Sequence, residues 1–507
     1  MSFNLAITLH ESAKRWPGQP AVIFDQGSMT YAELDAVSDR VAVNLRRYGI
    51  EPGVAVGLQL PNIPQFLMAY FGILKAGGVV VPMNVLLKAP EIAYYLGDSD
   101  AQAVITAADT ITEAAKGAAE AGVQEIFVVA GGQRAADSVG TDFDELLAGD
   151  QPDPPPFEQR DPGDTAVILF TSGTTGRPKG VELTHFELYM NADAHRQGFE
   201  MTNTDVMVAV APMFHTLGLS GVLNSTVLAG GALRLMVRFD AGQMLEVIQN
   251  DKATIFHGVP TMYHALLQHP RLEDYDTSSL RIAGSAGSAL PAKFLDSFER
   301  KFGVIILELY GLTESGPVAT FNRRDDRKPY SVGKPIWGVD MQVWDAEGRP
   351  LGPGKENIGE FVLRGHCVTK GYYRNPEGTA EAITDGWLRT GDLGYQDEEG
   401  FYFIVDRKKD LVIRGGYNVY PREVEDVLYK HPAVGQVAVI GIPDERLGEE
   451  VRAYCVLKRG QVATEQELID FAKERLAAYK YPRSVVFLGE LPTGPSGKIL
   501  KKELSVH

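Results

Sequence analysis

The chain has few cysteines and no long apolar run. Among its 507 residues are two cysteines, Cys367 and Cys455, too few for a disulfide framework and without metal-ligand spacing. The N-terminus lacks a basic segment followed by an apolar one, so it does not resemble a signal peptide. The most apolar stretch, residues 66–74, is broken by Lys75 and Pro82 far short of the ~20 residues that a membrane span needs. We therefore expect a cytoplasmic protein without a transmembrane segment.

Positive charge is also scarce. Lys and Arg number 49 against 66 Asp and Glu, a net charge of −17, which disfavours nucleic acid as a partner because such binding requires a basic surface. Any anionic ligand must therefore be held by local cations. A chain of 507 residues also exceeds the size at which one core normally keeps growing, which predicts two or more domains.

The middle of the chain alternates short β-rich runs with helical patterns, which is typical of a parallel α/β architecture. Loops after several of these strands are expected to line one crevice, because ligands of open α/β sheets bind beyond the carboxyl ends of the strands. A Pro/Asp-rich connector occupies residues 149–164, and alternating strands with Gly-rich turns begin near Ser331. We place the domain boundary within 407–410, which gives an N-terminal domain of residues 1–408 and a C-terminal α+β domain of residues 409–507.

The loop TSGTTGRPKG, residues 171–180, follows an apolar run that reads as a strand, and a helix is expected over residues 184–197. Glycines let backbone N–H groups approach a phosphate, hydroxyls donate to it, and a helix N-terminus would add partial positive charge. The spacing is not that of a Walker A loop, which disfavours a P-loop NTPase. A plain surface turn is the alternative at this point.

Three further stretches carry polar side chains suited to nucleotide chemistry. YGLTES offers Tyr310 for stacking on a base, Thr313 as a hydroxyl and Glu314 as a possible Mg²⁺ ligand. RTGDLG supplies Asp392 for a ribose diol, and GPSGKILKKEL places Lys498 on a glycine turn. Taken singly, each is better explained as a core aromatic, a turn residue or a solvated tail.

Together these stretches resemble the adenylate-forming superfamily, which includes acyl-CoA synthetases, 4-coumarate-type ligases, beetle luciferases and peptide-synthetase adenylation domains. The resemblance covers nearly the whole chain in the right order. It implies an α/β fold, with a large N-terminal domain of mixed parallel sheets and a small β-barrel-like part, followed by a mobile C-terminal α+β domain. The implied enzyme is an acyl-CoA ligase that converts a carboxylic acid and ATP to acyl-AMP and pyrophosphate, then transfers the acyl group to CoA, with Mg²⁺ as cofactor.

The resemblance also assigns roles to residues. Catalytic roles fall to His215 beside the acyl carboxylate, Thr313 at the α-phosphate, Glu314 at Mg²⁺, and Lys498, whose cation would stabilise charge during adenylation. Tyr310 would stack on adenine, Asp392 and Arg407 would hold the ribose, Lys409 would be the hinge, and Gly415-Gly416 would meet the pantetheine arm of CoA. The remaining nucleotide contacts are Thr171, Ser172, Gly173, Thr174, Thr175, Gly176, Lys179, Gly287, Ser288, Ala289 and Gly311, with Thr171 also at the metal.

The acid itself is less defined. FHTLGLSGVLNS and FHGVPTMYH are apolar and contain small residues, Gly218, Ser220, Gly221 and Gly258, which are expected to leave room for a hydrophobic acid of medium to long chain or a bulky cyclic one. An aryl or cinnamate-type acid stays open. Alternatives are an acyl-AMP ligase that loads an acyl carrier protein, a luciferase-type oxygenase, and a nucleotide-binding regulatory protein without chemistry. We expect a monomer or a homodimer.

Overall fold

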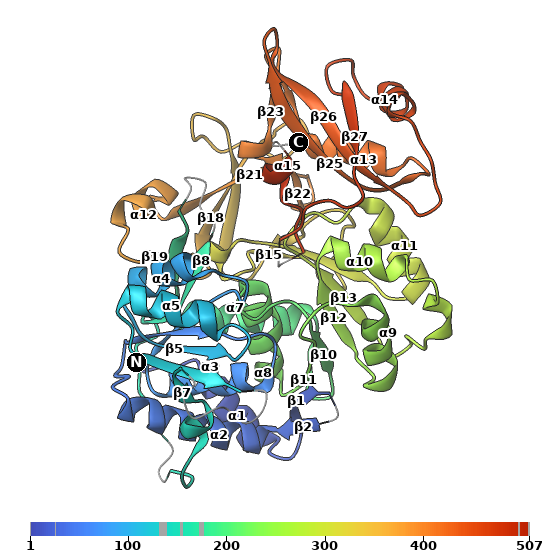
Figure 1. The fold of residues 1–507 in the computed structure, drawn as a ribbon. Coiled ribbons are helices and arrows are strands. Elements are labelled where there is room, and N and C mark those ends of the chain that lie inside the picture. The colour runs from blue at the N-terminus through green and yellow to red at the C-terminus, as the bar shows by residue number, and fades with distance from the viewer. Residues whose placement is uncertain are drawn as a thin grey trace.

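The computed structural model describes residues 2–25, 27–130, 139–152, 156–171, 177–494 and 497–504. The N-terminal part of the chain contains two large sheets and a smaller antiparallel one, and the C-terminal part, orange to red in Figure 1, sits on top of it. The functional residues predicted from the sequence come from both parts. Their junction is therefore the region of interest.

The first large sheet is parallel through its centre and antiparallel at both edges. Its strands, in spatial order, are β16 (Lys334–Pro335), β15 (Thr320–Phe321), β14 (Ile306–Tyr310), β13 (Ile282–Ser285), β12 (Ile255–Gly258), β10 (Val206–Ala209), β11 (Ala232–Leu235), β1 (Pro20–Phe24) and β2 (Gly27–Thr30). Helices α9 (Ala241–Asn250), α10 (Pro260–Leu267) and α11 (Ala292–Phe302) pack on one face through a shared apolar cluster.

The second large sheet is parallel except at β9 and β19. Its strands, in spatial order, are β19 (Gly371–Tyr372), β9 (Lys179–Thr184), β8 (Thr165–Thr171), β4 (Val79–Pro82), β3 (Ala55–Gln59), β5 (Ala101–Ala107), β6 (Glu125–Val129) and β7 (Thr141–Asp142). Helices α4 (Ala89–Asp98) and α5 (Ile111–Ala121) cover its outer face.

The largest apolar cluster fills the space between the two large sheets. Helix α3 (Pro64–Lys75) lies within it, and every residue from Phe66 to Lys75 is buried because this helix is apolar almost all round. The one charge at its end, Lys75, is paired with Asp35 at 2.5 Å and Asp39 at 2.6 Å on α2 (Tyr31–Arg47). Helices α1 (Ile7–Arg15), α7 (His185–Gly198) and α8 (Ser225–Ala229) add residues to the same cluster.

The rest of the chain builds two smaller sheets. An antiparallel sheet combines β17 (Val339–Trp344), β18 (Gly359–Gly365), β20 (Ile383–Thr384), β21 (Trp387–Gln396) and β22 (Tyr402–Arg407). The C-terminal sheet combines β23 (Val412–Arg414), β24 (Tyr417–Val419), β25 (Val434–Asp444), β26 (Gly448–Leu457) and β27 (Ser484–Phe487), with helices α13 (Pro421–Tyr429) and α14 (Glu465–Lys473) packed on it. The predicted fold class, α/β followed by an α+β C-terminal part, is confirmed.

One prediction about the loop at residues 171–180 is wrong. The loop does not lead directly into a helix, because β9 intervenes and pairs antiparallel with β8, Lys179 opposite Thr171. The alternating sequence of residues 179–184 favours a strand there. Helix α7 begins only at His185, where Thr184 and Glu187 cap its N-terminus reciprocally. That helix end lies beside Asp164, before the start of β8, whereas Thr171 is at the end of β8.

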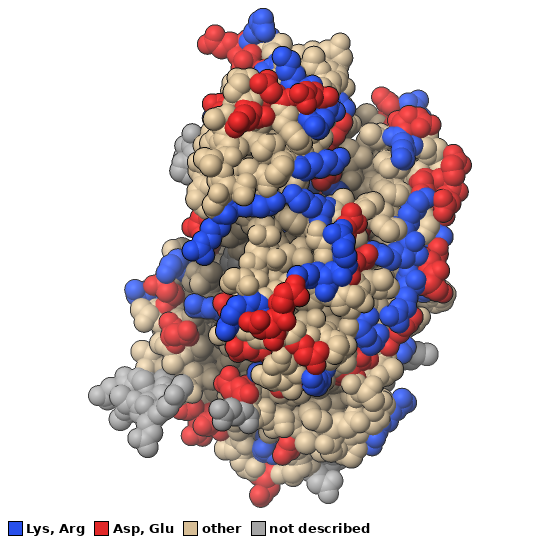
Figure 2. All heavy atoms as spheres, turned by 90° about the vertical axis from the view of Figure 1, so that its right-hand side faces the viewer, with Lys and Arg blue, Asp and Glu red and all other residues tan. Residues whose placement is uncertain are grey.

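The surface carries charges of both signs. On the face shown in Figure 2, acidic and basic side chains intermingle instead of forming a broad basic field. Within the described ranges, every helix is too short or too polar to cross a membrane. Both cysteines are buried and free.

Candidate active site at the junction of the two parts

A cavity of about 80 Å³ opens at the carboxyl ends of the parallel strands of the first sheet. Its wall combines residues that follow β10, β12, β13 and β14 with one side chain from the C-terminal part, Lys498. These loops therefore converge on one pocket, as expected from the sequence. The lining residues are Ala211, Pro212, His215, Thr216, Leu217, Val259, Met262, Ala286, Gly287, Leu309, Gly311, Leu312, Thr313, Pro317 and Lys498.

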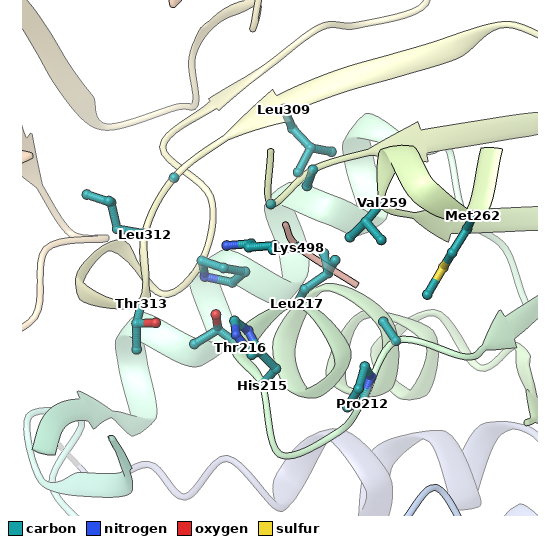
Figure 3. A pocket seen from close by; sticks show the side chains of 15 residues that line it. Pro212, His215, Thr216, Leu217, Val259, Met262, Leu309, Leu312, Thr313 and Lys498 are labelled. Atoms are coloured by element: carbon teal, nitrogen blue, oxygen red, sulfur yellow. The ribbon is translucent and has the colours of Figure 1, made fainter. Parts of the chain in front are cut away.

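Lys498 reaches this cavity from the C-terminal part. Figure 3 shows its side chain in the middle of the cavity, between Leu309 and Val259 on one side and His215 on the other. The hydroxyl of Thr261, on α10, donates to the carbonyl of Gly497 at 3.1 Å, and this bond fixes the turn that carries the lysine. Gly497 has φ +77°, which favours glycine.

The surroundings of Lys498 lower its pKa to about 8. Burial of the ammonium is the largest cause, and Arg407 and Lys409 add like-charge repulsion, while Asp392 acts in the opposite direction. At neutral pH the side chain is still mainly cationic. A cation in an apolar cavity can stabilise an anion strongly, because little solvent screens the two charges.

His215 faces the same cavity and is neutral. Burial, and to a smaller extent the charge of Lys498, lower its pKa to about 4. The loop that carries it follows β10, and Ala211 and Pro212 of this loop also line the cavity. With His215 neutral, the charge of the cavity lining comes from Lys498.

Asn62, a residue that the sequence analysis missed, holds this loop in place. Its amide nitrogen donates to the carbonyls of Ala209 at 2.9 Å and Ala211 at 3.0 Å, and its oxygen accepts from the N–H of Met213 at 3.0 Å. The side chain is 3% exposed. A polar residue before the apolar helix α3 looks like an ordinary turn residue in sequence, so only the fold reveals this role.

Tyr310, Asp392 and Arg407 form one linked group. Tyr310 donates from its hydroxyl to the Asp392 carboxylate at 2.8 Å, and the Arg407 Nε lies 3.4 Å from the same carboxylate. Burial raises the pKa of Asp392, and the Arg407 cation acts in the opposite direction. The Tyr310 ring is 6% exposed and packs edge-on against Phe361, so most of it belongs to the core.

Glu314 and Lys179 meet through Tyr372, a second residue that sequence reasoning missed. Tyr372, on β19, donates to the Glu314 carboxylate at 2.8 Å, and the Lys179 ammonium lies 4.8 Å from the centre of its ring. Thr171 is opposite Lys179 in the β8–β9 ladder. These residues therefore lie together at one edge of the second sheet, and no sequence motif links Tyr372 to them.

Other predicted residues are placed differently. Gly287 packs against the Lys498 side chain, since a Cβ at Gly287 would lie 3.1 Å from the Cε of Lys498. Ser288 and Ala289 follow Gly287 on the same loop. Lys409 is exposed on a short helical turn after β22. Gly415 and Gly416 form the exposed turn between β23 and β24, away from the cavity lining. The predicted phosphate contacts Ser172, Gly173, Thr174, Thr175 and Gly176 lie outside the described residues.

The expectation that small residues leave room in the acid pocket is wrong at the glycines. A Cβ at Gly218 would lie 2.1 Å from the Pro212 carbonyl, and one at Gly221 would lie 2.8 Å from the His195 Nε2. At Gly258 the space is taken by the ring of Phe256, since a Cβ there would lie 2.4 Å from its Cζ. These glycines permit close packing of backbone against its neighbours.

The comparisons with known proteins agree with this architecture. Residues 9–373 match the family model of the AMP-binding enzyme, and residues 423–498 match that of the AMP-binding enzyme C-terminal domain. A long-chain-fatty-acid–CoA ligase of Bacillus subtilis is 37% identical over 99% of this chain and 94% of its own. A feruloyl-CoA synthase of an Amycolatopsis species is 38% identical over 97% and 96%, respectively. The crystal structure of an anthranilate CoA ligase in complex with anthranoyl-AMP superposes with a TM-score of 0.92 at 30% identity, covering 99% of this chain and 96% of that one.

The fold, with a lysine delivered from a C-terminal domain to a cavity in a larger α/β domain, defines an enzyme that joins a carboxylic acid to a nucleotide. The chain belongs to the AMP-binding enzyme family. Its reaction class is that of an AMP-forming acid–thiol ligase, which makes an acyl-adenylate and then a thioester.

Replacement of Asn62 by Asp is expected to impair use of the acid. The change removes two buried hydrogen-bond donors and sets a carboxylate oxygen against two carbonyls, at ~1–3 kcal/mol for each buried group left unsatisfied. We expect kcat/KM for the acid to fall at least ~10-fold, while KM for ATP changes little. Asn44→Asp is the matched control, because buried Asn44 also donates to two carbonyls, those of Leu146 and Ala148, far from the cavity. An equal effect of both changes on the acid would refute a positioning role for Asn62.

The pKa of Lys498 predicts the pH dependence of adenylation. Because that pKa is lowered to about 8, the cation is present below this pH and is lost as the pH rises through it. The value of kcat/KM for ATP, which reports on the free enzyme, should therefore decline above pH 8. Lys498→Arg keeps its charge in this range and should flatten the decline even if its rate is lower. Persistence of the same alkaline limb in Lys498→Arg would assign it to another group.

Proposed function

We propose that the protein is an acyl-CoA ligase that activates a hydrophobic carboxylic acid with ATP and transfers the acyl group to CoA. The observation that carries this proposal is the Lys498 ammonium inside an apolar cavity, which neutral His215, Gly287 and Thr313 also line. Among relatives, a long-chain-fatty-acid–CoA ligase, a feruloyl-CoA synthase and an anthranilate CoA ligase support a hydrophobic or aryl acid. The enzyme then serves fatty-acid or related lipid metabolism.

In the first step a carboxylate oxygen of the acid attacks the α-phosphorus of ATP. The new oxygen–phosphorus bond gives the mixed anhydride, and the bond to the pyrophosphate leaving group breaks. Two anions must approach each other, so Lys498 contributes by placing a positive charge in the cavity where they meet. Thr313 lines the same cavity and is the proposed hydroxyl donor to the α-phosphate. We propose that the leaving pyrophosphate is bound by Thr171 to Gly176 together with Lys179. The nucleoside is bound by Tyr310, Gly311, Asp392 and Arg407.

The residues fit a magnesium ion that arrives with ATP. Magnesium in nucleotide sites takes one or two carboxylates and substrate phosphates, and Glu314 presents one carboxylate beside Lys179 through Tyr372. Thr171 adds a hydroxyl at the same edge of the sheet. Bound there, the ion would neutralise phosphate charge. Within the described residues no cluster of three or more His, Cys, Asp or Glu forms a separate metal site.

We further propose that the C-terminal domain, residues 409–507, rotates about Lys409 between the two steps. In the present arrangement Lys498 occupies the cavity and Gly415-Gly416 lies on an exposed turn. Thioester formation then requires Lys498 to withdraw and that glycine turn to approach the pantetheine arm, a hinge motion of known type. Lys409 is suited to a hinge because it is exposed on a short turn between β22 and β23.

The proposal also covers the thiol that accepts the acyl group, the cellular location of the protein and its oligomeric state. Free CoA is the proposed thiol, and an acyl carrier protein is the alternative acceptor, which the same chemistry would serve. Two buried free cysteines support a reducing cytoplasm as the location. A monomer or homodimer is the proposed assembly.

Pyrophosphate release with ATP and Mg²⁺ tests the proposed function. The acids should range from acetate through octanoate and palmitate to cinnamate and polycyclic acids, each with and without CoA. Multiple turnovers that need CoA and yield a thioester, greatest for hydrophobic acids, are expected. A single burst of pyrophosphate unaffected by CoA would assign the carrier protein as acceptor, and no release with any acid would refute the proposal.

Variants should separate the two steps. Lys498→Ala is expected to lower adenylation at least ~100-fold while supplied acyl-adenylate and CoA still give thioester, because the lysine acts only on charge built up in the first step. Gly416→Phe should do the reverse, since it adds bulk to the turn proposed to meet CoA. Gly460→Phe is the matched control, because Gly460 has a similar φ of +77° with open space around it. Loss of both half-reactions in either test variant would contradict the division of labour.

A further inference from the structure

Two histidines lie in the core immediately behind the cavity. His195 on α7 and His257 on β12 are both 0% exposed, and their ring centres are 5.8 Å apart. Phe199 packs on His257 at 5.2 Å and Phe321 packs edge-on against His195 at 5.9 Å. His257 lies in the FHGVPTMYH stretch, whereas His195 belongs to no motif that the sequence analysis singled out.

Within the described part of the chain, three of the four ring nitrogens of this pair lack a hydrogen-bond partner. His195 donates from Nδ1 to the carbonyl of Asn191 at 2.9 Å, which leaves Nε2 as a lone-pair acceptor. Among the described residues, His195 Nε2 and both ring nitrogens of His257 have no hydrogen-bond partner, and neither does the buried hydroxyl of Ser220. Buried polar groups in native proteins are nearly always paired, so each of these atoms requires an explanation.

Three structural connections join the pair to the cavity. His257 precedes the cavity-lining Val259 by two residues. Leu309 lines the cavity and is paired across β14 and β15 with Phe321, which packs on His195. In addition, Leu217 lines the cavity and is the first residue of helix η1 (Leu217–Asn224). One turn later in this helix, Gly221 packs against His195 Nε2. The imidazoles are thus the next layer inward from the cavity wall.

The size of the cavity makes this layer relevant to substrate choice. About 80 Å³ is well below the ~300–1,000 Å³ of typical ligand pockets, so a larger acid must displace part of the inner wall, Leu217 and Leu309. Its far end then meets the imidazole pair. A hydrocarbon there would leave the nitrogens unpaired, whereas a hydroxyl could donate to His195 Nε2.

The pair is also uncharged. Burial lowers the pKa of His195 to about 4, and burial with the neighbouring His195 lowers that of His257 well below its usual value. A neutral pair offers no counter-charge to a second carboxylate, so a dicarboxylic acid does not match it. A neutral group that donates a hydrogen bond does.

We propose that His195 and His257 form the inner end of the acid pocket and select acids that carry a neutral hydrogen-bonding group, such as a hydroxyl, remote from the carboxylate. The inference rests on the proposed function, because it places the acid in the cavity beside Lys498 and His215. It narrows the substrate class to hydroxylated aryl or chain acids.

Matched pairs of acids test the proposal in the wild-type enzyme: 4-hydroxycinnamate with cinnamate, 3-(4-hydroxyphenyl)propanoate with 3-phenylpropanoate, and 8-hydroxyoctanoate with octanoate. In at least one pair kcat/KM for pyrophosphate release should favour the hydroxylated acid by ~10-fold or more, because a site built to bond a hydroxyl discriminates against its absence. Ratios at or below one in all three pairs overturn the inference while leaving the proposed function intact. No pyrophosphate release with any acid would instead refute the proposed function.

Variants then locate the preference. His195→Phe and His257→Phe should reduce the hydroxyl preference towards one, mainly by loss on the hydroxylated acid, and calorimetry should show the same loss in its affinity. His185→Phe is the matched control, because His185 is equally buried, has its pKa lowered to about 4, and is bonded to Leu5 at the far end of α7. A preference that survives in both folded test variants overturns the assignment. If either variant fails to fold, the wild-type ratios still decide.

Discussion

The site depends on keeping a cation in an apolar cavity that belongs to another domain. Taking the Lys498 ammonium out of water is unfavourable, as its lowered pKa shows, and the structure compensates only in part through Asp392. Arg407 and Lys409 are repulsive, so the cation gains most when anions enter. The hydrogen bond from Thr261 to Gly497 holds the turn without neutralising the charge. The arrangement is therefore suited to a carboxylate and a triphosphate, and it is poorly satisfied without them.

In the larger domain, the cavity around Lys498 is shaped by loop backbone as much as by side chains. The loops that face Lys498 follow parallel strands, and their direction is set by contacts far away in sequence. Asn62 fixes the loop before His215 across about 150 residues of chain, and Tyr372 links Glu314 to Lys179 from β19. Removal of such a residue changes the positions of reacting groups without touching substrate, which is how a small displacement costs catalysis.

The sequence was sufficient for the class of fold and for the residues within local motifs. Strand patterns at β8, β10 and β12 and the helices α3, α7 and α13 follow from periodicity, because a buried face or an apolar helix leaves a local signal. Strand β9 was missed because its signal is short and adjoins a Gly/Thr loop. Asn62, Tyr372 and the pairing of His195 with His257 carry no local signal, since the partners are tens to hundreds of residues apart in the chain. The glycines near the acid were misread for a related reason: sequence shows a missing side chain but not which neighbour fills its place.

Chemistry and acid recognition occupy different layers of one cavity, and this bears on how relatives with similar sites accept different acids. Lys498, His215 and Thr313 line the cavity in which we propose that the carboxylate reacts, and the strand-end loops form most of its wall. The inner layer comes from α7, η1 and β12. Substitution there alters volume and hydrogen bonding at the far end of the acid without moving the reacting groups. Recognition can thus change while adenylation is retained, and the neutral, unpaired imidazoles are the feature of this chain on which its own selectivity would depend.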